Sequence, residues 1–261
     1  MIYLKTADEI LLMQEAATLV SRTLGEVAKW VAPGVTTARL DAISREFMLD
    51  NGGRPACLGY QGFPGTLCIE VNDTVVHGFP SDYALHDGDI VGIDTVVDLN
   101  GYCGDSAYTF AVGDVDPKTM QLLRDTKEAL ARGIAEAKVG ARIGNISNAV
   151  QTFCERRGYG VVREMTGHGI GRSMHEAPEV PNFGRRGIGP VLKPGMCICI
   201  EPMINLGSKN VVISSADGWT CKTKDHKPSA HYEHTLAILD NETRVLTTFD
   251  YIKEALGDRF I

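Results

Sequence analysis

The chain has 261 residues, of which 44% are hydrophobic and 23% are charged, so it is long enough to bury a large core. Its net charge of −7 argues against general binding of nucleic acids, which needs a basic surface. No apolar run reaches membrane-spanning length, and Asp8 and Glu9 stand where a signal peptide would be apolar. We therefore expect a cytoplasmic protein that binds neither DNA nor membranes. The seven cysteines lack zinc-type spacing and are interpreted as reduced thiols.

Helical and strand-like segments alternate along the chain. Apolar residues at helical spacing predict helices over residues 7–31, 39–49, 116–137 and 146–156. Short apolar runs predict strands over residues 68–71, 90–97, 102–112, 160–164, 196–200, 232–239 and 244–248, with only strands and loops after the last predicted helix. Because short turns join antiparallel neighbours, these blocks predict an α/β or α+β fold built from hairpins.

The most informative segment is a predicted hairpin that contains Asp94 and Asp105. Asn100-Gly101 is a strong two-residue turn signal, and a turn there places Asp105 opposite Val96. Because Val96 shares a strand face with Asp94, the two carboxylates are diagonal neighbours, close enough to hold two bridged metal ions. The alternative interpretation is structural, with each aspartate only flanking a turn or capping a strand end.

Further polar residues lie at the ends of predicted core strands or in a glycine-rich segment. Glu201 follows the apolar run 196–200, and Glu233 precedes another. His168 stands in a glycine-rich segment, residues 166–178, that we predict to be a loop, and its two flanking glycines permit a close approach to a ligand. Buried, unpaired carboxylates are costly and require a shared cation, so we predict a dinuclear metal site. Its candidate ligands are Asp94, Asp105, His168, Glu201 and Glu233. The alternative for the glycine-rich segment, a phosphate-binding loop, is discounted because no Lys-Ser or Lys-Thr follows it.

A weak internal repeat relates two parts of the chain. Residues 34–47 and 140–153 align as a glycine followed by an amphipathic helix. In the same order, His77 matches His175 and Asp94 matches Glu201. We therefore expect a single domain over residues 1–261, with internal halves of about 1–113 and 114–261, and we add both histidines to the candidate site. Without the repeat, His175 would be interpreted as an ordinary loop histidine.

Five motifs of this chain resemble those of a known family and occur in the same order. They are found at residues 72–80, 88–105, 166–171, 200–203 and 231–235. Together they closely resemble the type I methionine aminopeptidases, which are M24 "pita-bread" peptidases, over nearly the whole chain. The resemblance implies pseudo-twofold duplicated halves and a central, largely antiparallel curved sheet covered by helices. The short bacterial form is expected, because the chain begins almost at the first helix and no long insertion separates Glu201 from Glu233.

The resemblance also implies an activity and its metal chemistry. A metal-bridging hydroxide would attack the scissile peptide and remove the initiator methionine from nascent proteins when the second residue is small. Two divalent ions are implied, drawn from Co, Mn, Fe, Ni or Zn, for which a set of four carboxylates and one imidazole is suited. Asp105 and Glu233 would bridge the ions, Asp94 would complete one site, and His168 with Glu201 would complete the other.

Roles for the remaining residues follow from the same resemblance. Glu201 would shuttle the proton, His175 would stabilise the oxyanion, and His77 would orient the substrate. The methionine side chain would bind against sulfur and aromatic groups, which suit a thioether. These groups are Cys57, Tyr60, Phe63, Cys68 and Trp219. Phe63 and Met174 stand where Tyr and Phe are common in the family, so the departures bear on fine specificity.

The expected partners are the N-termini of nascent polypeptides, with ribosome association implied by the family alone, and the expected state is a monomer. Two alternatives stay open at this point. One is a related aminopeptidase that cleaves Xaa-Pro bonds. The other is a catalytically silent binding protein of the same fold, for which loss of a ligand residue would be expected, although none is lost.

Overall fold

The computed structural model describes the whole chain, residues 1–261. Four of its α-helices lie where the apolar spacing predicts them. The helices are α1 (Ala7–Ala28), α2 (Thr37–Asp50), α3 (Pro117–Glu136), α4 (Ile143–Glu155) and α5 (Asp250–Leu256). Helix α1 begins with a capping box, in which the Thr6 side chain accepts from the Glu9 amide and the Glu9 carboxylate accepts from the Thr6 amide.

The prediction of strands and loops alone after residue 156 is wrong, because α5 follows the last strand. This helix has only seven residues, too few to show helical periodicity in the sequence. Its position depends on close packing against α1, where a Cβ at Gly25 would overlap Tyr251. Tertiary packing therefore stabilises a helix that the local pattern does not indicate.

The strands form four sheets, and every strand pairing within them is antiparallel. In the first sheet β4 (Ile90–Leu99) pairs with β1 (Arg54–Pro55), β2 (Cys68–Val71) and β5 (Tyr102–Ala111). The second contains β13 (Ser229–His231), β10 (Met203–Asn205) and β6 (Gly160–Val161), and the third contains β11 (Val211–Ile213), β12 (Cys221–Thr223) and β3 (Thr74–Val76). The fourth runs in the order β15 (Thr243–Val245), β14 (His234–Ile238), β9 (Cys197–Ile200), β7 (Gly167–Gly169) and β8 (Glu176–Val180).

The predicted hairpin is confirmed in its register as well as its existence. Strands β4 and β5 pair with Val96 opposite Asp105 and with Asp94 opposite Ala107. The turn residues Asn100 and Gly101 have φ of 55° and 78°, which matches the twist of a tight hairpin. The two aspartates therefore project from one face of the sheet, as the turn signal predicts.

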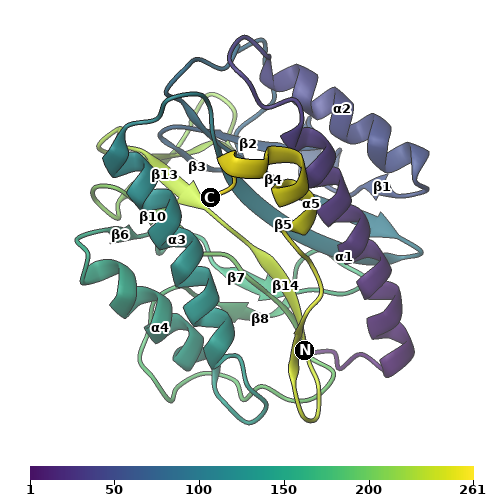
Figure 1. Cartoon of the computed structure of the whole chain (residues 1–261). Helices are drawn as coiled ribbons and strands as arrows, with labels where there is room; N and C mark the ends of the chain where they lie inside the picture. The colour runs from purple at the N-terminus through teal and green to yellow at the C-terminus, as the bar shows by residue number, and fades with distance from the viewer.

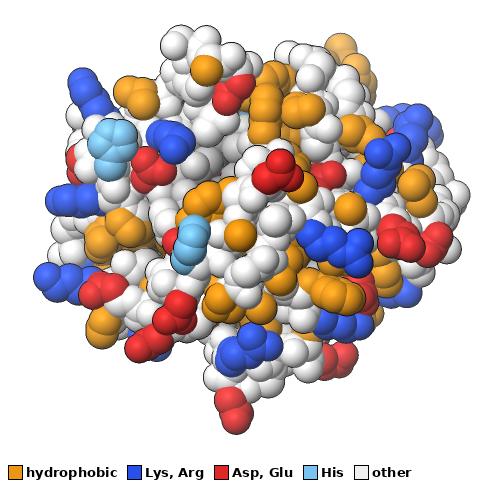
Figure 2. Space-filling model, turned by 90° about the horizontal axis from the view of Figure 1, so that it is seen from above, with side chains coloured by type: hydrophobic (Ala, Val, Ile, Leu, Met, Phe, Trp, Pro, Cys, Tyr) orange, Lys and Arg blue, Asp and Glu red, His pale blue; other side chains and the backbone are white.

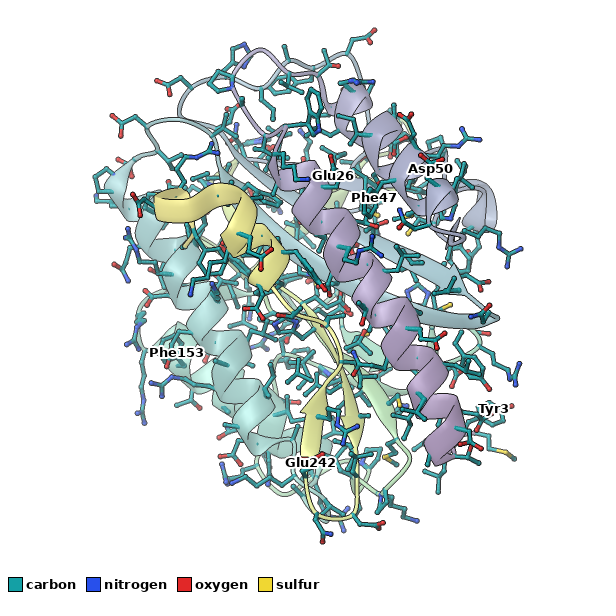
Figure 3. The ribbon with its side chains drawn as sticks, turned by 45° about the vertical axis from the view of Figure 1, so that its right-hand side comes forward. Tyr3, Glu26, Phe47, Asp50, Phe153 and Glu242 are labelled. Carbon is teal, nitrogen blue, oxygen red and sulfur yellow. The ribbon has the colours of Figure 1, made fainter.

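The helices gather on one side of the strands (Figures 1 and 3). The largest buried cluster joins residues of α1 and α3 to the hairpin and to β9, so this layer buries the apolar outer face of the strands. The residues that line a large cavity come instead from strands and from the segments between them, and none belongs to an α-helix. The helices thus leave the inner face of the strands free to carry a site.

No helix of the chain is both long enough and apolar enough to cross a membrane. On the face seen in Figure 2, acidic and basic side chains are interspersed rather than gathered by sign. All seven cysteines are buried and free, in agreement with reduced thiols. The division of the domain into halves near residue 113 stays a prediction.

Gly104 provides a test of how tightly α1 packs on the hairpin. A Cβ at this position would overlap the backbone of Ala16 and Ala17, and a helix backbone cannot yield as a side chain can. We expect Gly104→Ala to lower the free energy of unfolding by about 1–3 kcal/mol, the usual cost of overpacking. Urea denaturation measures this change, and an unaltered midpoint would show that α1 can shift without cost.

Candidate metal centre

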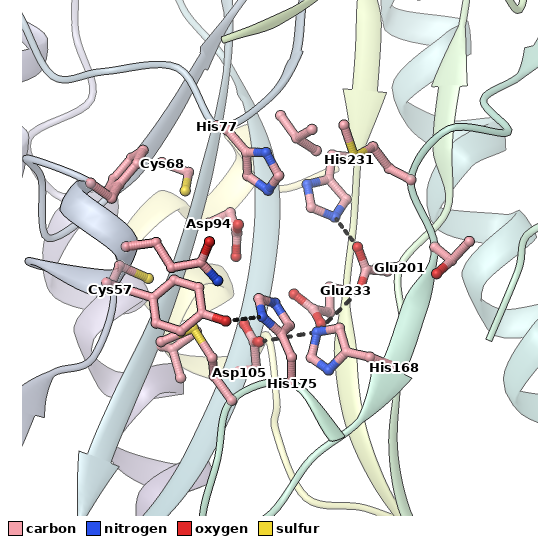
Figure 4. A pocket seen from close by; sticks show the side chains of 18 of the residues that line it. Cys57, Cys68, His77, Asp94, Asp105, His168, His175, Glu201, His231 and Glu233 are labelled. Atoms are coloured by element: carbon pink, nitrogen blue, oxygen red, sulfur yellow. Dashed lines mark hydrogen bonds and ion pairs between the residues drawn. The ribbon is translucent and has the colours of Figure 1, made fainter. Parts of the chain in front are cut away.

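A cavity of about 520 Å³ opens on the inner face of the strands (Figure 4). It is lined by every residue that the sequence predicts for the site. These are Cys57, Tyr60, Phe63, Cys68, His77, Asp94, Asp105, His168, His175, Glu201, Trp219 and Glu233. Residues as far apart in the chain as Cys57 and Glu233 therefore meet in one place.

Hydrogen bonds to the hairpin place Glu233 beside Asp105. The Glu233 amide donates to the Ala107 carbonyl (2.9 Å), and the Ser106 hydroxyl donates to the Glu233 carbonyl (3.0 Å). The Asp105 amide donates in turn to the Thr235 hydroxyl (3.2 Å). Both carboxylates are buried, with exposed fractions of 3% and 2%. The β5 strand and the segment before β14 thus hold two carboxylates against each other.

His168 lies in β7, the strand between β8 and β9, so the prediction that residues 166–178 form a loop is wrong there. A Cβ at Gly169 would overlap Ala177 of β8, which explains the need for glycine. The His168 Nδ1 lies 3.0 Å from the Gly169 carbonyl, which can only accept, so Nδ1 carries the hydrogen. The Nε2 lone pair then faces Asp105 Oδ2 at 3.6 Å and Glu201 Oε1 at 3.4 Å.

The potential ligand atoms fall into two groups that Glu201 connects. Asp105, His168, Cys199 and Glu233 offer atoms within 4.8 Å of one another, and so do Glu70, Asp94 and His231. Glu201 contacts a histidine of each group, at 3.4 Å for His168 and at 3.9 Å for His231. Burial raises the pKa of the Cys199 thiol well above its usual value, which disfavours the thiolate that a metal would bind.

Several buried oxygens in this cluster have no hydrogen-bond partner. They are Asp105 Oδ1, Glu201 Oε1 and Glu233 Oε1. An orphaned buried acceptor costs free energy, and native proteins pair nearly all such groups. These oxygens can only accept, and no hydrogen-bond donor points at them. A bound cation would satisfy such a group of acceptors.

The pKa shifts of the cluster have the same cause. Burial, with repulsion from neighbouring carboxylates, raises the pKa of Asp105, Glu201 and Glu233 well above the usual range. Burial also lowers the pKa of His168 to about 3, so its imidazole is neutral and able to donate a lone pair. Without a cation the carboxylates cannot all ionise. The residues present therefore fit a divalent metal ion.

The two repeat-related histidines line the same cavity. The Tyr60 hydroxyl lies 3.1 Å from His175 Nδ1, and the His175 ring meets the His168 ring edge-on at 4.5 Å. His77 has a φ of 60°, a conformation that residues with a side chain rarely adopt and that is often retained at functional sites. Burial lowers the pKa of His77 to about 4 and also lowers that of His175, so both imidazoles are neutral.

Aromatic and sulfur groups form the wall beside the carboxylates. Phe63 packs edge-on against Trp219 at 5.3 Å, and Trp219 packs against His77 at 5.8 Å. Cys57 and Cys68 are both buried in the same cluster. The cavity thus has a charged end and an apolar end.

Two residues were missed among the predicted site residues: His231, which lines the cavity, and Glu70, which contacts His231. A signal for each exists in the sequence, because strand side chains alternate and residues two apart share a face. Glu70 stands two positions from Cys68, and His231 stands two positions from Glu233. Two-residue spacing from the predicted site residues Cys68 and Glu233 would have identified them.

The fold and the carboxylate-rich cavity define a metal-dependent hydrolase. Residues 11–240 match the metallopeptidase family M24. The methionine aminopeptidase of Clostridium perfringens is 50% identical over 247 residues, which cover 95% of this chain and 99% of that protein. The crystal structure of methionine aminopeptidase from Rickettsia prowazekii aligns with a TM-score of 0.94 at 40% identity, covering 95% of this chain and 100% of that one. The prolidase from Pyrococcus horikoshii shares the fold, with a TM-score of 0.76 at 22% identity, covering 94% of this chain and 63% of that one.

The chain therefore belongs to metallopeptidase family M24 and, within it, to the methionine aminopeptidases. Membership confirms the expected pita-bread fold and the use of divalent metal by an enzyme that acts on polypeptides.

Proposed function

We propose that this enzyme removes the initiator methionine from the N-termini of nascent polypeptides when the second residue is small. The observation that carries the proposal is the union, in one cavity, of a buried carboxylate cluster with a wall of sulfur and aromatic groups. The proposed setting is the cytoplasm, with the enzyme acting as a monomer on chains that emerge from the ribosome.

The proposed metal centre holds two divalent ions. Asp105 and Glu233 would bridge them, Asp94 would complete one site, and His168 with Glu201 would complete the other. Carboxylates and neutral imidazole suit Co, Mn, Fe, Ni or Zn, and the open cavity leaves positions for a substrate. When bound, such a pair of ions polarises a carbonyl and lowers the pKa of water.

The protein residues supply proton transfer and orientation. Glu201 lies between His168 and His231 and is the proposed proton shuttle for the attacking water and the leaving amine. With the Tyr60 hydroxyl donating to Nδ1, neutral His175 carries its hydrogen on Nε2 and serves as the proposed donor to the developing oxyanion. His77 is the proposed group that orients the substrate beside the scissile bond.

The proposed methionine pocket is the apolar end of the cavity. Its walls are Cys57, Tyr60, Phe63, Cys68 and Trp219. A flexible thioether contacts sulfur and aromatic edges favourably, by about 0.3–1.5 kcal/mol for each contact. The packing of His77 on Trp219 places the substrate-orienting histidine next to this wall. We infer that this juxtaposition leaves little space for a large second residue.

Peptide profiling with metal-loaded enzyme tests the proposed function. We expect release of free methionine from Met-Ala-Ser and from peptides with Gly or Ser in second place. Met-Leu, Met-Phe and Met-Lys peptides should be poor substrates. Preferential cleavage of Ala-Pro peptides would favour the Xaa-Pro alternative, whereas no metal-dependent cleavage of any peptide would favour a silent binding protein.

Trp219→Ala tests the methionine pocket. Loss of this wall should relax selection for methionine at the first residue, because an apolar pocket discriminates by about 1–3 kcal/mol for each methylene. The ratio of kcat/KM for Met-Ala and Leu-Ala substrates measures the effect, and metal content serves as the control because Trp219 is not a proposed ligand. A wild-type ratio near one would contradict a dedicated methionine pocket.

A further inference from the structure

A buried pair formed by Glu70 and His231 lies outside the five proposed ligands. Figure 4 shows His231 of this pair beside Glu201. Glu70 stands on β2 and His231 ends β13, and each side chain is only 2% exposed. The His231 Nδ1 lies 3.0 Å from Glu70 Oε1. The His231 amide donates to the Thr109 hydroxyl at 3.0 Å, which fixes the backbone from which the imidazole projects.

The position of Glu70 depends on the residue opposite it. Glu70 pairs with Gly92 across β2 and β4, and a Cβ at Gly92 would overlap the Glu70 carboxylate. The carboxylate therefore occupies space that only glycine leaves free. This packing, with the hydrogen bond to Nδ1, holds the imidazole in one orientation.

The remaining polar atoms of the pair have no partner. His231 Nε2 and Glu70 Oε2 are buried and make no hydrogen bond. His231 lines the cavity, and its Nε2 lies 3.9 Å from Glu201 Oε2. The pair thus aims an unsatisfied imidazole nitrogen at a proposed metal ligand.

His231 repeats the arrangement of His168. In both residues an oxygen lies 3.0 Å from Nδ1, the Gly169 carbonyl for His168 and the Glu70 carboxylate for His231. In both, Nε2 faces one oxygen of Glu201, Oε1 for His168 and Oε2 for His231. A metal-bound histidine commonly has its second ring nitrogen held by a carboxylate or a carbonyl, which sets the tautomer and the ring orientation.

We propose that His231 is a further metal ligand, which binds through Nε2 the ion that Glu201 holds, and that Glu70 is the residue that positions it. This inference rests on the proposed function, because it extends the same metal centre. It adds a second imidazole on the side of the centre opposite His168.

The competing role for the pair is a counter-ion. Burial is the largest single effect and disfavours the imidazolium, but the charge and hydrogen bond of Glu70 together with the charge of Asp94 raise the pKa of His231. A protonated His231 would then neutralise Glu201 and exclude a metal ion from Nε2. The two roles make opposite predictions, since removal of a ligand weakens metal binding whereas removal of a buried cation strengthens it or leaves it unchanged.

The test is a calorimetric titration of the metal-free, full-length protein with Zn²⁺ alone, which measures the affinity for each ion. We expect His231→Gln to weaken binding of at least one ion by about 10-fold or more. Glu70→Gln should reduce the affinity for the same ion by a smaller factor, because an amide oxygen can still accept a hydrogen bond from His231 Nδ1. His226→Gln is the matched control, because that histidine is exposed and pairs with Asp73. It should bind zinc like the wild type.

Zinc-edge X-ray absorption of the loaded wild type provides a second readout that does not require a variant to fold. We expect the spectrum of the wild type to show two imidazole ligands shared between the two zinc ions. The spectrum of the His231→Gln protein should show one. Unchanged zinc affinity in His231→Gln together with a single imidazole in the wild type would overturn the inference and leave the proposed function intact. Failure of the wild type to bind zinc or any other divalent ion would instead overturn the proposed function.

Discussion

Replacement of Asp105 by alanine is expected to abolish peptide cleavage and to lower the metal content of the purified protein. Asp105 is the proposed bridging ligand from β5, and its Oδ2 lies 3.6 Å from His168 Nε2. A bridging carboxylate serves both ions at once, so its loss removes a contact from each and leaves the remaining carboxylates to repel one another. Elemental analysis of the protein and assay of methionine release from Met-Ala-Ser measure the two effects.

Asp98→Ala is the matched control for this experiment. Asp98 belongs to the same hairpin but pairs with Arg54 and accepts from the Gly101 amide in the turn, away from the cavity. It should retain metal content even if the hairpin turn is weakened. Turnover of Asp105→Ala close to that of the wild type would refute the dinuclear assignment.

The second prediction with a large expected effect distinguishes the roles of the two histidines that face each other in the cavity. His175→Ala should lower kcat by about 10²-fold or more with metal still bound, as expected when a donor to the transition state is lost. His168→Ala should lose metal affinity, because its Nε2 faces Asp105 and Glu201. The rings lie 4.5 Å apart, so the contrast depends on role rather than on location.

Zinc titration and steady-state kinetics of both variants decide this assignment. Tyr60→Phe is an informative companion, because it removes the hydroxyl 3.1 Å from His175 Nδ1 and leaves the ring itself in place. It should reduce kcat by less than His175→Ala and leave metal binding unchanged. Identical metal titrations for His168→Ala and His175→Ala would show that ligand and catalytic donor have been wrongly distinguished.

Local patterns were sufficient for much of this fold. The hairpin register follows from the Asn100-Gly101 turn and from strand alternation, and both are properties of a short stretch of sequence. The long helices likewise follow from apolar spacing and capping, as at Thr6 and Glu9. Short elements were less predictable. The three-residue strand that carries His168 is stabilised by two neighbouring strands, which the local sequence does not reveal.

The sequence by itself determined which chemistry-bearing residues this protein offers: a hairpin with two aspartates, a histidine between glycines, and glutamates beside core strands, in an order that resembles the methionine aminopeptidases. Only the tertiary structure decided which of them meet, because residues such as Glu70 and His231 are 161 positions apart and pair only when β2 and β13 approach. It also decided which polar atoms are left without a partner. Burial and pairing arise from packing between distant segments, whereas turn and helix signals depend on neighbours in sequence.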